Sequence, residues 1–295
     1  MDITKVIIPV AGLGTRFLPV TKSIPKAMIP IFDTPSIHYA VKEAMIAGMK
    51  EVIIVMSRGQ EAIIEYFNNS LKSDRNSNYN QKMDEISYIN NNVSLNIVYQ
   101  DNPRGLGDAI LQCKDIINGE PFGVILPDDL ILGNNSIISE MSKVYTQKKS
   151  SVIAIKKVPS ILLPNLGVVD AKRIESKVYE ILNMVEKPKI EDAPSDLAII
   201  GRYILPYEIF ETLEKTNLGI NGEIQLTDAI DSLIKDIGVL GYQFPEVHFD
   251  VGTPLGLLKA SIHQSMKNEE FIDDIKSFFK FYFYQCFRQL FLINL

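Results

Sequence analysis

Short runs of β-branched residues alternate with longer amphipathic stretches along the first half of the chain. This alternation is typical of βα units on a largely parallel sheet. The runs predict strands at residues 5–10, 52–56, 95–99 and 122–126. Apolar residues with helical spacing over residues 37–45 predict a helix between the first two strands. We therefore expect an α/β fold with a Rossmann-like, mixed and mostly parallel sheet flanked by helices.

A polar stretch at residues 68–92 predicts an exposed insertion with some helix in it. The second half of the chain has a different pattern. Strand character resumes at residues 151–158, and further short strands are expected as far as residue 204. An amphipathic pattern over residues 226–234 predicts a helix, and helix is also expected from residue 253 onward. This half is predicted to form a smaller, β-rich lobe.

The bulk composition is that of a folded, soluble protein. Of the 295 residues, 46% are hydrophobic and 22% are charged, close to the averages for globular domains. The formal net charge is −6, so no overall basic field attracts a nucleic acid. Two distant cysteines, Cys113 and Cys286, define no disulfide framework, which favours a reducing compartment. We expect a cytoplasmic protein that does not bind nucleic acid.

The two ends of the chain carry no membrane signal in this interpretation. The N-terminus lacks the basic region and cleavage site of a secretory signal. The aromatic-rich C-terminal end is interrupted by Lys280 and Arg288 and falls short of the roughly 20 apolar residues that a spanning helix needs. We expect no membrane association, and we expect residues 271–295 to form a helical tail.

The loop after the first predicted strand has the features of a phosphate-binding loop. Gly12 and Gly14 allow the backbone N–H groups to approach an anion, and Arg16 can bind a phosphate through two hydrogen bonds. Phe17 stands where a dinucleotide fingerprint would need a third glycine, and no P-loop triplet follows. Lys26 adds a cation on a proline-stiffened arm. By itself this pattern is also typical of an ordinary strand-to-loop turn.

Carboxylates stand at two places where a ligand site is plausible. Asp128 and Asp129 follow a buried strand, at the end where α/β sheets position ligands, and Asp250 precedes a predicted helix. A hard carboxylate oxygen suits Mg²⁺. Taken alone, an Asp-Asp pair is equally typical of a turn or a helix cap, and Asp250 of a helix cap.

The N-terminal motif carries a resemblance to a known family. Gly-Leu-Gly-Thr-Arg at residues 12–16, Leu-Pro at 18–19, Thr-Lys at 21–22 and Pro-Lys at 25–26 together resemble the signature of sugar-nucleotide pyrophosphorylases. The similarity is greatest to the branch that joins UTP to glucose 1-phosphate. It spans about residues 3–270, and further matching blocks lie at residues 100–109, 125–129, 167–170, 185–188, 197–203, 222–230 and 249–254.

This resemblance implies a fold and an organisation. The fold would be of the nucleotide-diphospho-sugar transferase type. Residues 1–270 would form one domain, with a nucleotide-binding part at about 1–150 and a sugar-binding part at about 151–270. The enzyme would act on UTP and glucose 1-phosphate, use Mg²⁺ as its cofactor and form a homo-oligomer.

The resemblance also implies a role for each site residue. The nucleotide would be bound by Ala11, Gly12, Gly14, Gln100 and Gly107. The sugar would be bound by Gly167, Glu186, Lys187 and Gly201. Magnesium would be held by Asp128 and Asp250. Catalysis would depend on Arg16, Lys26, Asp128 and Lys187. Two alternatives stay open: a thymidylyltransferase or an enzyme for another sugar phosphate, and a non-catalytic sugar-nucleotide sensor on the same fold.

Overall fold

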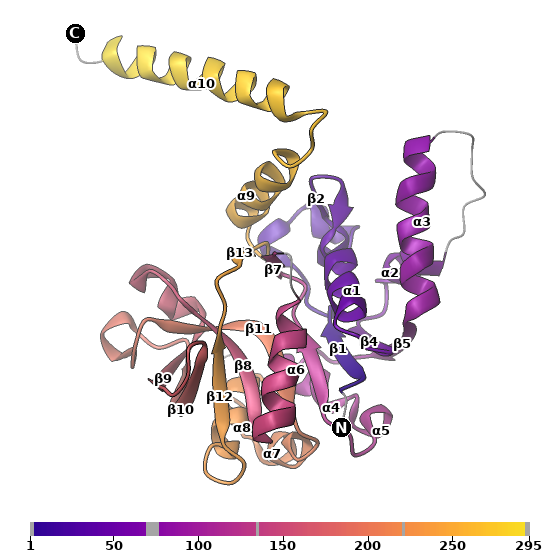
Figure 1. Ribbon diagram of the computed structural model, residues 1–295, viewed down its shortest axis with the longest axis vertical. Helices are drawn as coiled ribbons and strands as arrows, with labels where there is room; N and C mark the ends of the chain where they lie inside the picture. Colours follow the sequence, from indigo (N-terminus) through magenta and orange to yellow (C-terminus); the bar gives the residue numbers. More distant parts are fainter. Residues whose placement is uncertain (1–2, 69–76, 134–135, 220–221, 293–295) are drawn as a thin grey trace.

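A nine-stranded mixed sheet forms the centre of the protein. The computed structural model describes residues 3–68, 77–133, 136–219 and 222–292 (Figure 1). The strands are β1 (Lys5–Pro9), β2 (Pro30–Ile31), β3 (Thr34–Pro35), β4 (Glu51–Met56), β5 (Ser94–Tyr99), β6 (Phe122–Ile125), β7 (Asp129–Leu132), β8 (Ser151–Lys157), β9 (Gly167–Arg173), β10 (Val178–Glu186), β11 (Leu197–Leu205), β12 (Val239–Gln243) and β13 (Val247–Asp250). The order in the large sheet is β5-β4-β1-β6-β11-β8-β12-β10-β9.

Helices cover both faces of this sheet. They are α1 (Ser36–Ile46), α2 (Ala62–Asn68), α3 (Ser77–Asn92), α4 (Leu106–Leu111), α5 (Lys114–Ile117), α6 (Ile137–Lys148), α7 (Ile209–Lys215), α8 (Leu226–Leu233), α9 (Pro254–Ser265) and α10 (Ile272–Leu292). Short 3-10 turns η1 (Thr15–Phe17), η2 (Val20–Lys22) and η3 (Lys26–Met28) follow β1. The predicted α/β fold, with a mixed sheet between helices, is confirmed.

The alternation of side chains along β1 explains the three layers. Val6 and Ile8 belong to a core cluster that also contains residues of α1, α3 and α6, whereas Ile7 belongs to a second cluster with residues of α4, α7 and α8. Successive side chains of a strand point to opposite faces, so a strand buried on both sides is apolar throughout. All three residues are fully buried. The two cores therefore fix the sheet between two helical layers.

Strand direction changes at the middle of the sheet. β5, β4, β1 and β6 are parallel to one another, and β11 runs antiparallel to β6 and β8. At the far edge, β10 pairs antiparallel with both β12 and β9. A separate two-stranded sheet, β7 with β13, places Asp129 opposite Asp250. The β-rich second half thus continues the same sheet as the first half.

The polar insertion contains the predicted helix, α3. Its described part packs on the body through the buried residues Ile86 and Ile89, whereas residues 69–76 lie outside the described residues. At the other end of the chain, α10 projects away from the body (Figure 1). Among the described residues, no helix combines the length and the apolar character needed to cross a bilayer.

Candidate active site

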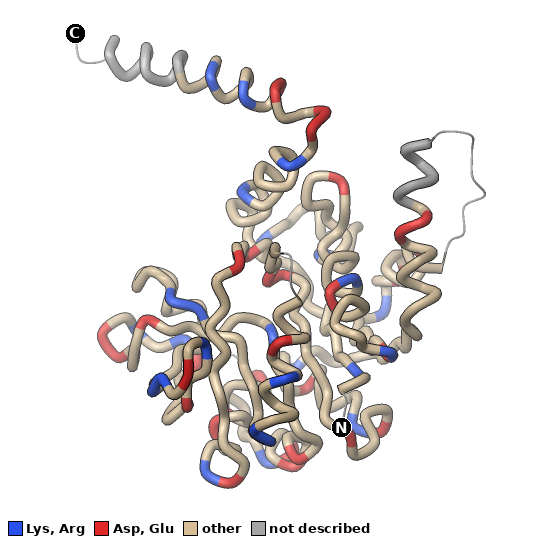
Figure 2. The backbone as a smooth tube through the Cα atoms, in the orientation of Figure 1, with Lys and Arg blue, Asp and Glu red and all other residues tan. Residues whose placement is uncertain are grey.

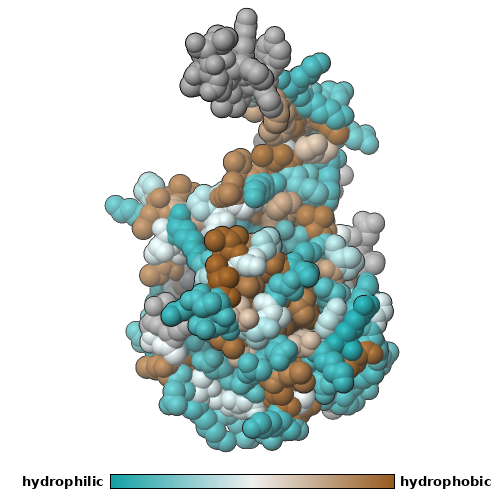
Figure 3. Space-filling view, turned by 90° about the vertical axis from the view of Figure 1, so that its left-hand side faces the viewer, coloured by the Kyte–Doolittle hydropathy of each residue, from teal (hydrophilic) through white to brown (hydrophobic). Residues whose placement is uncertain are grey.

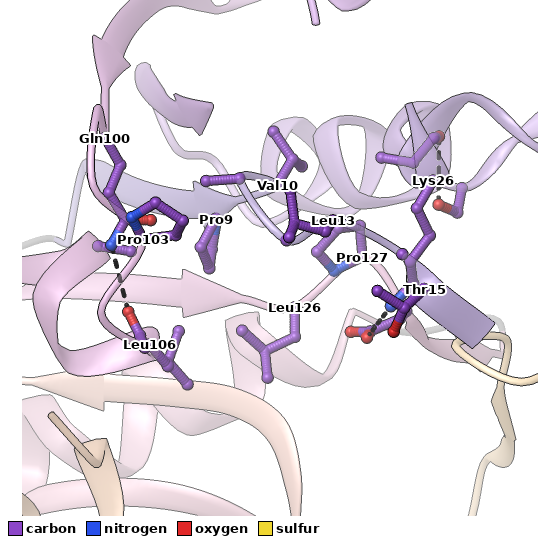
Figure 4. A pocket seen from close by; sticks show the side chains of 18 of the residues that line it. Pro9, Val10, Leu13, Thr15, Lys26, Gln100, Pro103, Leu106, Leu126 and Pro127 are labelled. Atoms are coloured by element: carbon purple, nitrogen blue, oxygen red, sulfur yellow. Dashed lines mark hydrogen bonds and ion pairs between the residues drawn. The ribbon is translucent and has the colours of Figure 1, made fainter. Parts of the chain in front are cut away.

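A cavity of about 500 Å³ lies at the carboxyl ends of β1 and β6 (Figure 4). Loops that follow parallel strands meet at this edge, where α/β sheets bind their ligands. The cavity is lined by segments that are distant in the sequence: the loop after β1, the arm after η2, the end of β5 and the loop after β6. Six residues predicted from the sequence line it: Ala11, Gly12, Gly14, Lys26, Gln100 and Asp128.

The backbone after β1 faces the cavity with unused hydrogen-bond donors. Within the described part of the chain, the N–H groups of residues 11–14 have no hydrogen-bond partner. Gly14 has a φ of 63°, and a Cβ there would lie 2.9 Å from the Cβ of Lys26 and from Cγ2 of Thr21. A larger residue at this position would push the Lys26 arm away. The loop can therefore offer backbone donors to a nucleotide while it holds Lys26 close.

Lys26 and Asp128 form an ion pair at the edge of the cavity. Lys26 Nζ donates a hydrogen bond to Asp128 Oδ2 at 2.6 Å, and both side chains are about half-buried (Figure 4). A Cβ built on Gly252 would lie 3.1 Å from that Asp128 oxygen, 3.2 Å from Lys26 Nζ and 2.8 Å from Asp250 Oδ1. The glycine thus leaves a space on which two carboxylates and one ammonium converge.

This donor set fits a magnesium ion. Mg²⁺ prefers oxygen ligands and binds through one or two protein carboxylates, completing its shell with water and substrate phosphates. The described residues contain no cluster of three or more His, Cys, Asp or Glu side chains that could hold a metal ion by itself. Asp128 and Asp250 would therefore hold the ion together with a bound phosphate.

The charges around Asp250 influence its protonation. Burial raises the pKa of Asp250, and the negative charges of Asp129 and Asp128 raise it further. The positive charge of Arg16 acts in the opposite direction, so Arg16 lies close enough to be felt at Asp250. Arg16 itself is exposed on η1 and does not line the cavity. A cation beside Asp250 would favour the ionised carboxylate that a metal ion requires.

Asp129 has a supporting position instead. Its carboxylate accepts hydrogen bonds from His248 Nε2 at 2.6 Å and from the N–H of Gly201 at 3.0 Å. Burial acts to raise the pKa of Asp129, but the hydrogen bond from His248 and the charge of Arg202 hold it below its ordinary value. A Cβ on Gly201 would lie 2.5 Å from Asp129 Oδ2 and from the Cβ of Leu126. Gly201 therefore packs beneath the loop that carries Asp128.

A buried arginine holds the same loop from behind. Arg202 forms a bidentate ion pair with Glu43 of α1, with distances of 2.8 to 3.1 Å. Its Nη1 also donates to the carbonyl of Leu126 at 3.0 Å and to that of Gly201 at 2.9 Å. The Arg202 side chain is only 2% exposed, so this pair is satisfied inside the protein. The backbone leading to Asp128 is consequently fixed to α1 and β11.

Gln100 marks the opposite end of the cavity. Its amide nitrogen donates to Asp108 Oδ2 at 2.6 Å. The same nitrogen lies 3.4 Å from the carbonyl of Gly105, beside the cavity (Figure 4). Gly107 does not line the cavity: its N–H donates to the carbonyl of Ile224, and a Cβ there would lie 2.7 Å from that oxygen. Gly107 thus lets α4 approach residues 222–226 closely.

Three of the four residues predicted to bind the sugar, Gly167, Glu186 and Lys187, form a second cluster outside the cavity, whereas Gly201 lies under the loop that carries Asp128. Gly167 lies opposite Glu186 in the β9–β10 pairing, and Lys187 Nζ forms an ion pair with Glu186 Oε1 at 3.1 Å. Thr227 of α8 donates to Glu186 Oε2 at 2.7 Å. A Cβ on Gly167 would lie 3.2 Å from both the Thr227 and the Glu186 oxygen, so the glycine leaves room beside this carboxylate.

A short connection joins the two clusters. The N–H of Ile224 donates to the carbonyl of Arg104, and the N–H of Gly107 donates back to Ile224. Three residues further on, Thr227 holds Glu186. Tyr203 lies near both clusters: burial raises the pKa of its phenol, and the charges of Asp129, Glu186 and Asp128 raise it further. These contacts link the cavity to the Glu186 cluster through residues 224–227.

Sequence reasoning missed several residues of this site. Glu223 lines the cavity, and Thr227 orients Glu186, but neither residue of the matching block at 222–230 was assigned a role from the sequence. Asp108, in the matching block at residues 100–109, also had no assigned role. The spacing of Arg104 and Asp108, four residues apart, was the available signal.

Comparison with known proteins identifies the class that this fold and this site define. Residues 5–266 match the protein-family model described as "Nucleotidyl transferase". The chain belongs to this family. It is 39% identical over 284 residues to "UTP–glucose-1-phosphate uridylyltransferase 2" of Streptococcus pyogenes, a match that covers 94% of this chain and 95% of that protein.

Solved structures agree with this assignment. A UDP-glucose pyrophosphorylase complexed with UDP-glucose is 42% identical, with a TM-score of 0.86 over 90% of this chain and 100% of that one. A UTP-bound UGPase from Acinetobacter baumannii is 36% identical, with a TM-score of 0.82 over 94% and 98% of the two chains. The predicted nucleotide-diphospho-sugar transferase type of fold is confirmed.

Proposed function

We propose that the protein is a UTP:glucose-1-phosphate uridylyltransferase, which makes UDP-glucose and pyrophosphate. The observation that carries this proposal is the convergence of Lys26, Asp128 and Asp250 at the edge of a cavity lined by free backbone donors and by Gln100. Such a site offers cations and donors to a triphosphate and an amide to a base. The names of the relatives at about 40% identity over nearly the whole chain support the same activity.

The reaction needs positioning more than acid–base chemistry. A phosphate oxygen of glucose 1-phosphate attacks the α-phosphorus of UTP in line, a new P–O bond forms, and the bond to the β-phosphate breaks to release pyrophosphate. The attacking oxygen is already anionic at neutral pH, so no general base is required. Repulsion between two anions is the main obstacle, and Lys26, Arg16 and Lys187 reduce it by their positive charge.

Mg²⁺ is the proposed cofactor, held by Asp128 and Asp250. When bound, it neutralises charge that develops on the phosphates. Lys26, which pairs with Asp128 and lines the cavity, binds the phosphates in this proposal. Ala11, Gly12 and Gly14 hold the nucleotide through their backbone, with Gln100 at the base.

The second cluster is the proposed sugar site. The Glu186 carboxylate accepts hydrogen bonds from glucose hydroxyls, and Lys187 neutralises the sugar phosphate. The arrangement that supports this role is the glycine opposite Glu186, which leaves room beside the carboxylate, together with Thr227, which fixes its orientation. Gly201 supports the loop beneath Asp128, and its direct contact with sugar stays a prediction.

A substrate panel tests the activity. UTP, dTTP and CTP are each combined with glucose 1-phosphate and with other hexose 1-phosphates, and pyrophosphate release is measured. We expect the highest kcat/KM for UTP with glucose 1-phosphate. An equal or higher efficiency with dTTP would overturn the nucleotide assignment. Tight binding of UDP-glucose without turnover, at saturating Mg²⁺, would identify a sensor instead of an enzyme.

Removal of metal tests the cofactor. Excess EDTA is expected to stop product formation, and added Mg²⁺ is expected to restore it. Without a metal ion, the two negatively charged carboxylates cannot neutralise the negative charge of the phosphates. Full activity in excess chelator would disprove the metal role of Asp128 and Asp250.

We also infer a cytoplasmic homo-oligomer with one catalytic domain at residues 1–270. The scarcity of cysteine supports the reducing compartment, and Figure 2 shows acidic and basic residues mixed over the fold, as expected for a protein that acts on small molecules. Apolar surface lies near the base of the projecting α10, where Phe32, Phe271 and Phe278 gather (Figure 3). Measuring the particle mass with and without residues 279–295 tests whether the tail joins subunits. An unchanged number of subunits per particle would show that the tail does not join them.

A further inference from the structure

Asp108 is a buried carboxylate that the proposed reaction does not use. It lies in the first turn of α4, and only 1% of it is exposed. Its Oδ2 accepts the hydrogen bond from Gln100 Nε2 at 2.6 Å, and its Oδ1 accepts one from Arg104 Nη2 at 2.8 Å. A charge this deep is costly unless it is hydrogen-bonded. Both of its bonds lead to the base end of the cavity.

The carboxylate determines which way the Gln100 amide points. A carboxamide has one end that only accepts and one end that only donates, whereas an ionised carboxylate only accepts. The other neighbour of Gln100 Nε2 is the carbonyl of Gly105, which is also an acceptor. The reversed amide would place two oxygens 2.6 Å apart in the protein interior. Asp108 therefore holds the nitrogen of Gln100 inward.

This leaves the oxygen of Gln100 as the group available to a ligand. Gln100 is 3% exposed and lines the cavity beside Pro103 and Leu106 (Figure 4). No donor within the described residues reaches its Oε1. A buried acceptor that stays unpaired in the complex would cost affinity, so a matching donor on the base is favoured.

We propose that Asp108 is a positioning residue that selects the base through Gln100. With its oxygen toward the cavity, Gln100 accepts a hydrogen bond from a pyrimidine that carries N3–H, as uracil and thymine do. Cytosine has an unprotonated nitrogen at N3, which only accepts, so Gln100 Oε1 would meet it acceptor to acceptor. The proposal rests on the nucleotide site described above, and it assigns the discrimination against cytosine to a residue that does not touch the base.

The test exchanges the hydrogen-bonding character of position 108 without changing its size. In Asp108→Asn, the guanidinium of Arg104 can only donate and takes the new amide oxygen. The new NH₂ group then faces Gln100, whose amide turns its oxygen inward and its nitrogen toward the cavity. With glucose 1-phosphate and Mg²⁺, we expect the UTP-to-CTP ratio of kcat/KM to fall by about tenfold or more, with an absolute gain for CTP.

Two further variants distinguish a change in the orientation of the Gln100 amide from a general loss of activity. Asp108→Ala removes the constraint, so the ratio is expected to fall without CTP becoming preferred. Asp101→Asn is the matched control: it removes a carboxylate next to Gln100 that pairs with Arg58 at 2.8 Å at the surface. Its ratio is expected to equal that of the wild type.

The outcomes are distinct. An unchanged ratio in folded Asp108→Asn overturns the inference. If neither variant at position 108 folds, N3-methylated UTP, which lacks the N3–H, is tested instead. A wild type that uses it as well as UTP contradicts an acceptor at Gln100. A loss of kcat/KM of about tenfold that disappears in Gln100→Leu supports such an acceptor. A wild type that releases no pyrophosphate from UTP would contradict the proposed function itself, and this inference with it.

Discussion

The two ends of the site are built in different ways. At the nucleotide end, backbone donors of residues 11–14 and the Lys26–Asp128 pair line a single cavity on the parallel part of the sheet. At the sugar end, Glu186 and Lys187 lie at the tip of an antiparallel pair of strands, held by each other and by Thr227. The first end is formed by loops at the centre of the fold, and the second by side chains at its edge.

This difference predicts different effects of mutation at the proposed nucleotide end and the proposed sugar end. The nucleotide end is tied to the core through Arg202, which bonds the carbonyl of Leu126 and pairs with Glu43. The sugar end has no comparable buried ion pair among the residues that the structure describes. Changes at the nucleotide end should therefore affect folding or turnover, whereas changes at the sugar end should mainly affect binding of one substrate.

The largest effect, on stability, is expected from removing the buried Arg202–Glu43 ion pair that supports the nucleotide end. Arg202→Met leaves the Glu43 carboxylate, which is 13% exposed, without its partner. We expect the free energy of unfolding to fall by about 3–5 kcal/mol, measured by urea denaturation. The double variant with Glu43→Leu should recover a large part of this loss, because it removes the unpaired charge. A stability close to that of the wild type in Arg202→Met would disprove the role of the pair.

The next effect concerns turnover alone. Asp128→Asn keeps an oxygen for Lys26 but loses the charge that a metal ion requires, so kcat should fall by about 10²–10³-fold. The melting temperature should stay near that of the wild type, because Asp128 is only half-buried. Asp170→Asn, which changes an exposed carboxylate on β9, serves as the control. Normal kcat in folded Asp128→Asn would remove this residue from the metal site.

The smallest effect should appear at the sugar end. Glu186→Gln keeps an acceptor for Thr227 but weakens the bonds to sugar hydroxyls and to Lys187. KM for glucose 1-phosphate should rise about tenfold, while KM for UTP changes little. Glu180→Gln on the same strand is the matched control, since Glu180 is exposed. An equal rise in both KM values would show that the two ends are not separable.

Local patterns in the sequence predicted the elements well where neighbouring residues decide the structure. The β-branched runs gave β1, β4, β5 and β6 to within one residue at each end, and the 3.6-residue spacing gave α1 and α8 to within one residue. Apolar Ile86 and Ile89, three residues apart, were the signal for the part of α3 that packs on the body. The insertion of β11 between β6 and β8 depends on long-range pairing, which no local pattern contains.

The site could be predicted only as far as its motifs. The resemblance assigned residues to nucleotide, metal and sugar, and the structure brings six of them to the cavity. The support of these residues was not predictable. Gly201 packs under Asp129 where β11 is irregular between Ile200 and Tyr203, and Asp108 reaches Gln100 only once the chain between β5 and α4 has turned back. Both contacts are consequences of tertiary structure.

The paired hydrogen bonds between Arg104, Gly107 and Ile224 have a consequence for substrate length. In a nucleotide sugar the diphosphate sets the separation of base and hexose. Here the groups proposed to bind the two are joined by a connection of only a few residues, from α4 through Ile224 to Thr227. Because a Cβ at position 107 would strike the Ile224 carbonyl, this connection cannot lengthen without a shift of the backbone. The fold thereby limits how far the cavity and the Glu186 cluster can move apart.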